Sequence, residues 1–286
     1  MQDTTLPVSG IDSHAHVFLK DLPWSEGRRY APSYDASLAL YQAQLASHGL
    51  SHGVLIQPSF LGTDNSYLID CLERFPGQFL GVVVLDPTGD LTLMEEYDAK
   101  GVVGIRANLI GTHTPDFAGE AWRVMLERMR ALDWHLEVQV EAERLGGISQ
   151  MIMQSGVRLV VDHFGRFDPG LGTGDPGLQN LIALGETQQV WVKISGAYRV
   201  SPRVGGPETH QRTGQSEMAS TARAAFTLLK HAFGVERLVW GSDWPHTAYE
   251  HTETFDTALT LFNEVVTDAA ERHAILTTTP RELFHF

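Results

Sequence analysis

The stretch Phe79–Leu85, FLGVVVL, carries no polar side chain over its whole length. A strand with one face in water alternates apolar and polar residues, whereas a parallel strand covered by helices on both faces is apolar throughout. Arg158–Asp162, RLVVD, has the same apolar centre. These two stretches predict a parallel sheet that is buried on both faces.

Outward from these stretches, short β-rich runs alternate with amphipathic helical patterns. Eight strands are expected, at Gly10–Phe18, Gly53–Gln57, Phe79–Leu85, Val102–Ala107, Trp134–Val140, Arg158–Asp162, Val190–Ile194 and Arg237–Trp240. Helices are expected at Asp35–Ser47, Asn65–Phe75, Leu91–Lys100, Glu120–Ala131, Leu145–Ser155, Leu178–Leu184, Met218–Phe233, Thr254–Val266, Asp268–Leu276 and from Pro280 onward.

Eight strand–helix units predict an α/β protein of one domain, residues 1–286, folded as a closed (β/α)8 TIM barrel. A doubly wound sheet is the alternative, but no glycine-rich phosphate loop follows the first expected strand. Two long loops interrupt this alternation of strands and helices. Gly165–Gly177 is rich in Gly, Pro and Asp, and Ser201–Gln215 is polar and long enough to form a lid or binding loop.

The composition narrows the classes of function. Of 286 residues, 43% are hydrophobic and 20% are charged, which is typical of a globular protein. Lys and Arg number 21 against 35 Asp and Glu, so the formal net charge is −14 and neither nucleic acid nor an anionic membrane surface is an expected partner. The single cysteine, Cys71, allows no intrachain disulfide and no thiolate metal cluster.

The expected location is cytoplasmic. No apolar run reaches the length of a membrane-spanning helix, and Met1–Ser9 has neither the basic nor the apolar region of a signal peptide. The sequence carries no signal for an oligomeric state.

Polar residues gather where the expected strands end. The first strand ends in Asp12-Ser13-His14-Ala15-His16, and strand alternation puts His14 and His16 on one face. His163 ends the sixth strand and Asp243 the eighth. A single one of these residues often means nothing, since a strand-end Asp is commonly a helix cap. Together at the carboxyl ends of barrel strands they predict a catalytic site.

Three arginines also end expected strands, namely Arg106, Arg166 and Arg199. The planar guanidinium binds carboxylates through two parallel hydrogen bonds, so the trio predicts a wall that holds a small anionic carboxylate substrate. Tyr30 and Ser59 are candidates for the same pocket, with simple packing as the alternative for each.

Seven motifs occur in a fixed order: GIDSHAHVF, GRRYAPSYDA, VLIQPSFLGTDN, GVVGIRANL, VVDHFGR, KISGAYR and WGSDWPH. Their combination resembles the amidohydrolase superfamily, and within it the branch that contains 2-pyrone-4,6-dicarboxylate lactonase and related TIM-barrel hydrolases. The resemblance implies a hydrolase acting on a small lactone that bears carboxylates. It also implies that Asp243 activates water, that His14, His16 and His163 polarise the scissile carbonyl, and that Arg106, Arg166 and Arg199, helped by Tyr30 and Ser59, hold the carboxylates.

The chain departs from this pattern at two places. The resemblance implies a second arginine shortly after Arg106, where the sequence reads Ile110-Gly111-Thr112-His113. An aromatic residue is also expected on the fifth strand, which carries Gln139. The identity of the dicarboxylate is therefore left open.

No cofactor and a metal-independent reaction are expected. Metal-dependent amidohydrolases often supply a histidine or a bridging lysine from strand four or five, where this chain offers Arg106 and Gln139. Arginine cannot ligate a metal because it stays protonated. One divalent ion, Zn or Mn, at His14, His16, His163 and Asp243 is the alternative.

Three functions follow from these observations. The first is a metal-independent lactonase of a small polycarboxylate. The second is a metal-dependent amidohydrolase or decarboxylase on the same barrel, which metal content would reveal. The third is a barrel that only binds a carboxylate, which a turnover assay would reveal and against which the presence of Asp243 argues.

Overall fold

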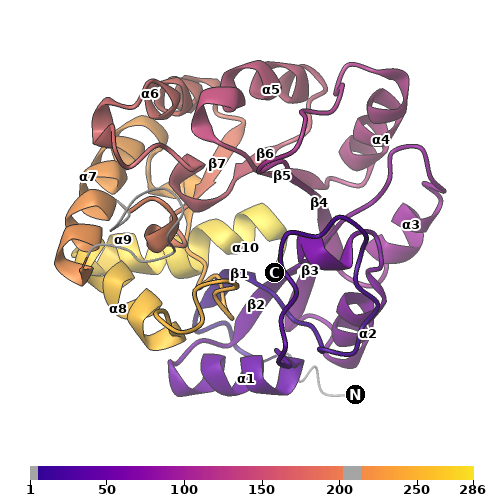
Figure 1. The fold of residues 1–286 in the computed structure, drawn as a ribbon, viewed down its shortest axis with the longest axis horizontal. Coiled ribbons are helices and arrows are strands. Elements are labelled where there is room, and N and C mark those ends of the chain that lie inside the picture. The colour runs from indigo at the N-terminus through magenta and orange to yellow at the C-terminus, as the bar shows by residue number, and fades with distance from the viewer. Residues whose placement is uncertain (1–5, 202–213) are drawn as a thin grey trace.

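A computed structural model describes residues 6–201 and 214–286. Most of the Ser201–Gln215 loop, expected to form a lid, lies outside these residues. Eight parallel strands follow one another around the sheet in chain order (Figure 1). They are β1 Ile11–Ala15, β2 His52–Ile56, β3 Phe79–Val83, β4 Val102–Asn108, β5 His135–Gln139, β6 Leu159–Val161, β7 Val190–Lys193 and β8 Leu238–Val239.

The ring is closed by the segment that follows β8, which pairs with β1. The backbone N–H of Ser13 donates to the carbonyl of Trp240 at 2.9 Å, and that of Asp243 donates to the carbonyl of His14 at 2.8 Å. The predicted (β/α)8 barrel is therefore confirmed. The first and last expected strands are shorter than predicted because their final residues leave the ladder and form the loops of the barrel mouth.

Helices surround the ring of strands. The outer helices are α1 Leu38–Ser47, α2 Ser66–Arg74, α3 Leu93–Asp98, α4 Glu120–Ala131, α5 Ala142–Gln154, α6 Pro176–Ala183, α7 Gln215–Phe233 and α8 Phe255–Val265, and they are followed by α9 Ala269–His273 and α10 Thr279–Phe284. The expected helix Asp268–Leu276 is split, since α9 continues into a π-helical turn at Ala274–Thr278. No helix among the described residues combines the length and the apolarity needed to cross a membrane.

Capping residues set where several helices begin. The Ser37 side chain accepts from the N–H of Leu40, so α1 starts after the predicted Asp35. Thr254 and Thr257 form a reciprocal capping box at the start of α8.

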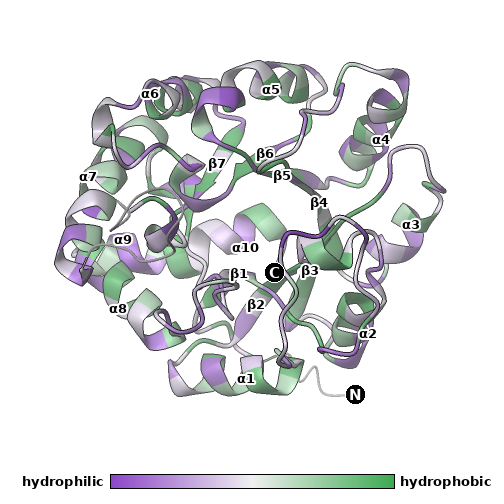
Figure 2. Cartoon of the chain, viewed as in Figure 1, coloured by the Kyte–Doolittle hydropathy of each residue, from purple (hydrophilic) through white to green (hydrophobic). Residues whose placement is uncertain are grey.

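Apolar side chains form one layer between the helices and the strands and a second layer inside the barrel. The inner layer contains Ile11, Val54, Ile56, Leu80, Val82, Val160 and Val239, and it is continued by Leu283 and Phe284 of α10. Figure 2 shows hydrophobic colour on the strands and mixed colour on the outer helices. In Figure 1 α10 lies across the centre of the ring. The C-terminal helix therefore fills the amino-terminal end of the barrel and leaves the opposite mouth for the site.

Candidate active site

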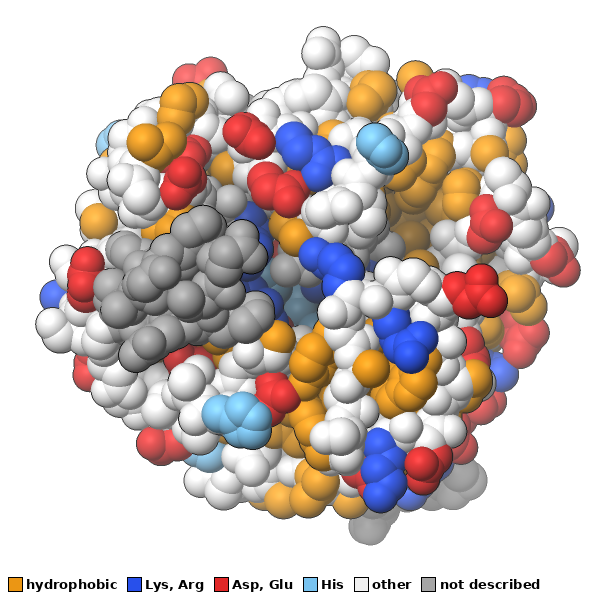
Figure 3. Space-filling view, viewed as in Figure 1, with side chains coloured by type: hydrophobic (Ala, Val, Ile, Leu, Met, Phe, Trp, Pro, Cys, Tyr) orange, Lys and Arg blue, Asp and Glu red, His pale blue; other side chains and the backbone are white. Residues whose placement is uncertain are grey.

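A cavity of about 320 Å³ opens at the carboxyl end of the strands. All the predicted site residues except His14 line it: His16, Tyr30, Ser59, Arg106, His163, Arg166, Arg199 and Asp243. His14 lies beside them, with its Nε2 3.8 Å from Oδ1 of Asp243. Figure 3 shows a central hollow with Arg or Lys and His side chains in its depth. The structure thus brings together the residues that the sequence singled out.

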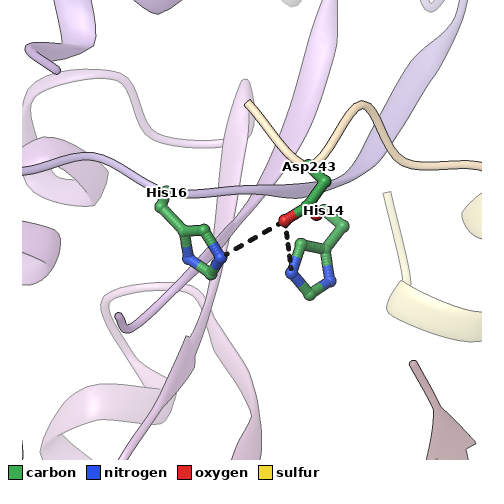
Figure 4. Close-up of side chains that lie close together, drawn as sticks. All are labelled: His14, His16 and Asp243. Carbon is green, nitrogen blue, oxygen red and sulfur yellow. Dashed lines mark ion pairs between the residues drawn. The ribbon is translucent and has the colours of Figure 1, made fainter. Parts of the chain in front are cut away.

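Asp243, His14 of β1 and His16, which follows β1, form the floor of the cavity (Figure 4). The Nε2 of His16 lies 3.7 Å from the same Oδ1 of Asp243, and the rings of His14 and His16 meet edge to face at 5.0 Å. His163 packs against His14 with ring centroids 4.8 Å apart. Asp243 has a φ of 61°, a left-handed conformation that is costly for most residues and is typical of functional sites.

The two carboxylate oxygens of Asp243 have different surroundings. Oδ2 accepts from Nε of Arg199 at 2.6 Å and from the hydroxyl of Tyr198. Oδ1 is buried and has no hydrogen-bond partner among the described residues. Burial alone would raise the pKa of Asp243, but the Arg199 guanidinium holds it well below its usual range. Asp243 is therefore ionised, with the lone pairs of Oδ1 open to the histidines.

The histidines are neutral. Burial, reinforced by Arg106, lowers the pKa of His16 to about 3. Burial also lowers the pKa of His14 to about 3, against the attraction of Asp162. Nδ1 of His16 lies 2.7 Å from the carbonyl oxygen of Ile56, and a carbonyl only accepts. The proton of His16 is therefore on Nδ1, and its Nε2 presents a lone pair to the cavity.

A buried group of charged side chains lies directly beneath this floor, and three of its members, Lys193, Glu137 and Asp162, were not assigned a role from the sequence. Lys193 of β7 pairs with Glu137 of β5, while Arg106 of β4 donates to Asp162 at 3.2 Å and to Gln139 at 2.8 Å. Burial and the neighbouring Asp162 carboxylate raise the pKa of Glu137 to about 8. The available signal was a charged residue inside an otherwise apolar strand, because such a side chain in a barrel can only point inward or into the helix layer.

The upper part of the cavity is rich in positive charge. Arg166 lies in the turn after β6 with a φ of 53°, and Arg29 adds a fourth guanidinium that sequence analysis did not single out although it adjoins Tyr30. Arg199, predicted to hold a substrate carboxylate, is also tied to Asp243 and lies over the Tyr198 ring at 5.0 Å. Tyr30 donates its hydroxyl hydrogen to Glu250 at the rim.

Three ligand atoms at the floor have the spacing of a metal site. Nε2 of His14, Nε2 of His16 and Oδ1 of Asp243 all lie within 4.8 Å of one another, and imidazole with carboxylate suits Zn or Mn. The His16 and Asp243 atoms both carry lone pairs that face the cavity. Nδ1 of His14 lies 3.1 Å from the Lys193 ammonium and 3.3 Å from Oδ1 of Asp162. In the shorter contact the ring nitrogen accepts, which leaves Nε2 of His14 without a lone pair for a metal. The proton of the neutral ring is then on Nε2.

A family model described as amidohydrolase matches residues 11–286. The chain belongs to the amidohydrolase family. This amidohydrolase is 30% identical to a 4-sulfomuconolactone hydrolase of Rhizobium radiobacter, over 98% of this chain and 91% of the relative.

Two crystal structures resemble this amidohydrolase along its whole length, and both are provisionally named 2-pyrone-4,6-dicarboxylic acid hydrolases. The structure from Pseudomonas putida is 42% identical with a TM-score of 0.88, and covers 98% of each chain. The structure from Acinetobacter baumannii has citric acid bound, is 34% identical with a TM-score of 0.90, and matches 97% of this chain and 100% of its own. The resemblance inferred from the seven motifs is confirmed.

Proposed function

We propose that this amidohydrolase hydrolyses a small lactone that carries carboxylate groups, with Asp243 as the base that activates water. One observation carries the proposal. Among the described residues that line the cavity, four are arginines and the acidic one is Asp243, whose Oδ1 is ionised and unpaired. A positive pocket in a protein of net charge −14 concentrates an anion where the protein as a whole would repel it.

The chemistry of lactone opening assigns a task to each group. Water attacks the ring carbonyl, its proton passes to Oδ1 of Asp243, and an oxyanion forms on the carbonyl oxygen. The ring C–O bond then breaks and the ring oxygen leaves. Because its pKa is held low, Asp243 is a weak base, which suits an activated lactone such as a 2-pyrone whose leaving group is an enolate. Donors that reach the developing oxyanion are worth roughly 3 kcal/mol each.

In this proposal the arginines bind and orient the substrate. Arg106, Arg166 and Arg199 hold carboxylates by charge-assisted hydrogen bonds, with Tyr30 and Ser59 completing the pocket. Fixing the anion in this way places its carbonyl against the floor that carries Asp243. The names of the relatives support the same substrate class, since 2-pyrone-4,6-dicarboxylate bears two carboxylates and a sulfomuconolactone bears comparable anionic groups.

We propose that the reaction needs no metal, because the arginines already supply the positive field that a metal would provide. The alternative is one divalent ion held by His16 and Asp243. Its support is that ligand atoms of His14, His16 and Asp243 lie within 4.8 Å of one another, and that Oδ1 of Asp243 has no hydrogen-bond partner among the described residues. Such an ion would supply Lewis-acid polarisation of the carbonyl.

A substrate panel tests the function. We expect the purified protein to hydrolyse 2-pyrone-4,6-dicarboxylate or 4-sulfomuconolactone, followed by loss of ring absorbance, and to leave unsubstituted 2-pyrone intact. Binding of a dicarboxylate without turnover of any lactone in the panel would favour the barrel that only binds. Equal turnover of the uncharged ring would contradict the role given to the arginines.

A further inference from the structure

Lys193 is a fully buried lysine that the proposed reaction does not use. It ends β7 beneath the cavity floor, with its ammonium against Glu137 and 3.7 Å from Oδ1 of Asp162. Its third neighbour is Nδ1 of His14, at 3.1 Å. An ammonium has hydrogens and no lone pair, so it donates to Glu137 and to Nδ1 of His14, while Asp162 is close enough for an ion pair.

Two carboxylates compete with Lys193 for the same ring nitrogen. Oδ1 of Asp162 and Oε1 of Glu137 lie 3.3 and 3.5 Å from Nδ1 of His14. Neither oxygen makes a hydrogen bond of suitable length and angle with a described residue, whereas the Lys193 ammonium lies nearer to Nδ1, at 3.1 Å. The geometry favours the contact with Lys193, in which Nδ1 accepts.

We propose that Lys193 is a positioning residue that fixes His14 in the tautomer with its proton on Nε2. His16 is held in the opposite tautomer by its hydrogen bond to Ile56. The two histidines therefore present one N–H donor and one lone pair to the same oxygen of Asp243, from 3.8 and 3.7 Å.

This arrangement matches the hydrogen-bonding needs of one nucleophilic water, a consequence that depends on the proposed function. The water donates one hydrogen to Oδ1 of Asp243 and the other to Nε2 of His16, and it accepts from the N–H of His14. One lone pair is left to form the new bond to the carbonyl carbon. The proton on the Asp243 side moves to the carboxylate as that bond forms.

The same tautomer works against a metal ion, because a protonated Nε2 has no lone pair to give. Without the ammonium, the ring would turn its Nδ1 proton toward Asp162 and expose a lone pair at Nε2, which is the usual state of a metal-binding histidine. Lys193 therefore decides between a site for water and a site for a metal.

The tautomer can be measured without substrate, by ¹⁵N NMR of histidine-labelled protein. Loss of one ring signal set in His14→Asn and another in His16→Asn assigns the two rings. We expect wild-type His14 to show a protonated Nε2 and His16 a protonated Nδ1. A protonated Nδ1 on wild-type His14 would overturn the proposal, whether or not any lactone is hydrolysed.

A variant tests the cause. Lys193→Met combined with Glu137→Gln removes the ammonium together with the carboxyl group that pairs with it, and Lys230→Met on the surface is the control. We expect His14 to change tautomer, zinc to bind at least about tenfold more tightly by calorimetry, and kcat to fall with little change in KM. An unchanged tautomer in the folded variant would refute the role of Lys193. If the variant does not fold, the wild-type spectrum decides.

Discussion

The two carboxylate oxygens of Asp243 differ in their hydrogen-bond partners. Oδ2 is fully engaged by Arg199 and Tyr198, which fixes the carboxylate and keeps it ionised, while Oδ1 is left for chemistry. A helix cap or a purely structural aspartate would use both oxygens for hydrogen bonds. The difference between Oδ1 and Oδ2 means that a substitution that changes only the carboxylate can test whether Asp243 is the base.

Asp243→Asn keeps the shape of the side chain but removes its ability to take a proton. We expect kcat to fall by roughly 10² to 10⁴ with little change in KM, measured by steady-state kinetics on the lactone that the panel identifies. Thermal unfolding of the same variant separates loss of the base from loss of the Arg199 ion pair. A folded, fully active variant would refute the mechanism and leave the fold untouched.

Arg166 and Arg199 respond differently to substitution by methionine. Arg166→Met removes a charge-assisted contact with the substrate, so KM should rise by about 10- to 100-fold, which corresponds to roughly 1.5–3 kcal/mol. Arg199→Met also removes the charge that lowers the pKa of Asp243, so that pKa should rise. The acidic limb of the kcat/KM profile should then move to higher pH only in Arg199→Met. The same limb position in both variants would show that Arg199 does not control the base.

The site residues that sequence patterns revealed share one property. His14, His16, His163 and Asp243 stand in motifs at strand ends, where alternation and the barrel geometry fix the direction of the side chain. Lys193 and Glu137 stand at similar positions, yet their role depends on which residues of neighbouring strands they meet. That information is in the register of β5, β6 and β7, which no single strand pattern contains.

Among the elements, the contact between β1 and the segment after β8 holds the floor of the site. Asp12 of β1 accepts from the N–H of Ser242 at 2.8 Å and from its hydroxyl, and from the N–H of His14 at 3.2 Å. These bonds place His14 and Asp243 on opposite sides of one seam. The strand ends and a closed barrel were predicted, but the residues that close it were not, because the closure depends on backbone that follows the last strand.

The seam carries a pH dependence of stability. Burial raises the pKa of Asp12 from 3.8 to about 6, against its hydrogen bonds with Ser242. Asp12 therefore binds its proton more tightly in the native state than in the unfolded state, so its own contribution to stability is lost as the pH rises from about 4 to about 6. The pKa shift corresponds to about 3 kcal/mol. In urea unfolding across this range, the free energy of unfolding of wild type should decrease relative to that of Asp12→Asn as the pH rises, and parallel curves would contradict the assignment.

The C-terminal helix should matter for stability and not for turnover. Phe284 of α10 is fully buried, contacts the His135 ring at the amino-terminal end of the barrel, and lies in the inner apolar layer. Phe284→Ala should lower the free energy of unfolding by about 3–5 kcal/mol. We expect kcat/KM below the unfolding transition to remain that of wild type. A large loss of activity in the folded variant would show that the two ends of the barrel are coupled.

At the scale of the whole molecule, the open question is whether the barrel works without a metal ion. Dialysis against a chelator, followed by elemental analysis, should leave kcat/KM unchanged. Loss of activity on chelation with recovery on adding Zn or Mn would favour the alternative, in which His16 and Asp243 hold an ion.

The barrel as a whole was predictable because its evidence is repeated. Each strand–helix unit adds an apolar run and an amphipathic pattern, so an error at one boundary leaves the count intact, as the three-residue strand β6 shows. The identity of the substrate has no such repeated evidence in the sequence. It depends on a few side chains in one cavity, of which Arg29 was missed and Arg199 has an additional partner.

The seam between β1 and the segment after β8 also sets when activity can arise during synthesis. His14 and His16 are synthesised well before Asp243. A nascent chain therefore contains most of its arginines long before Asp243, the proposed base, has been synthesised. A product terminated between Lys193 and Asp243 would retain anion-binding side chains and hydrolyse nothing, so catalysis reports that translation has reached the last strand.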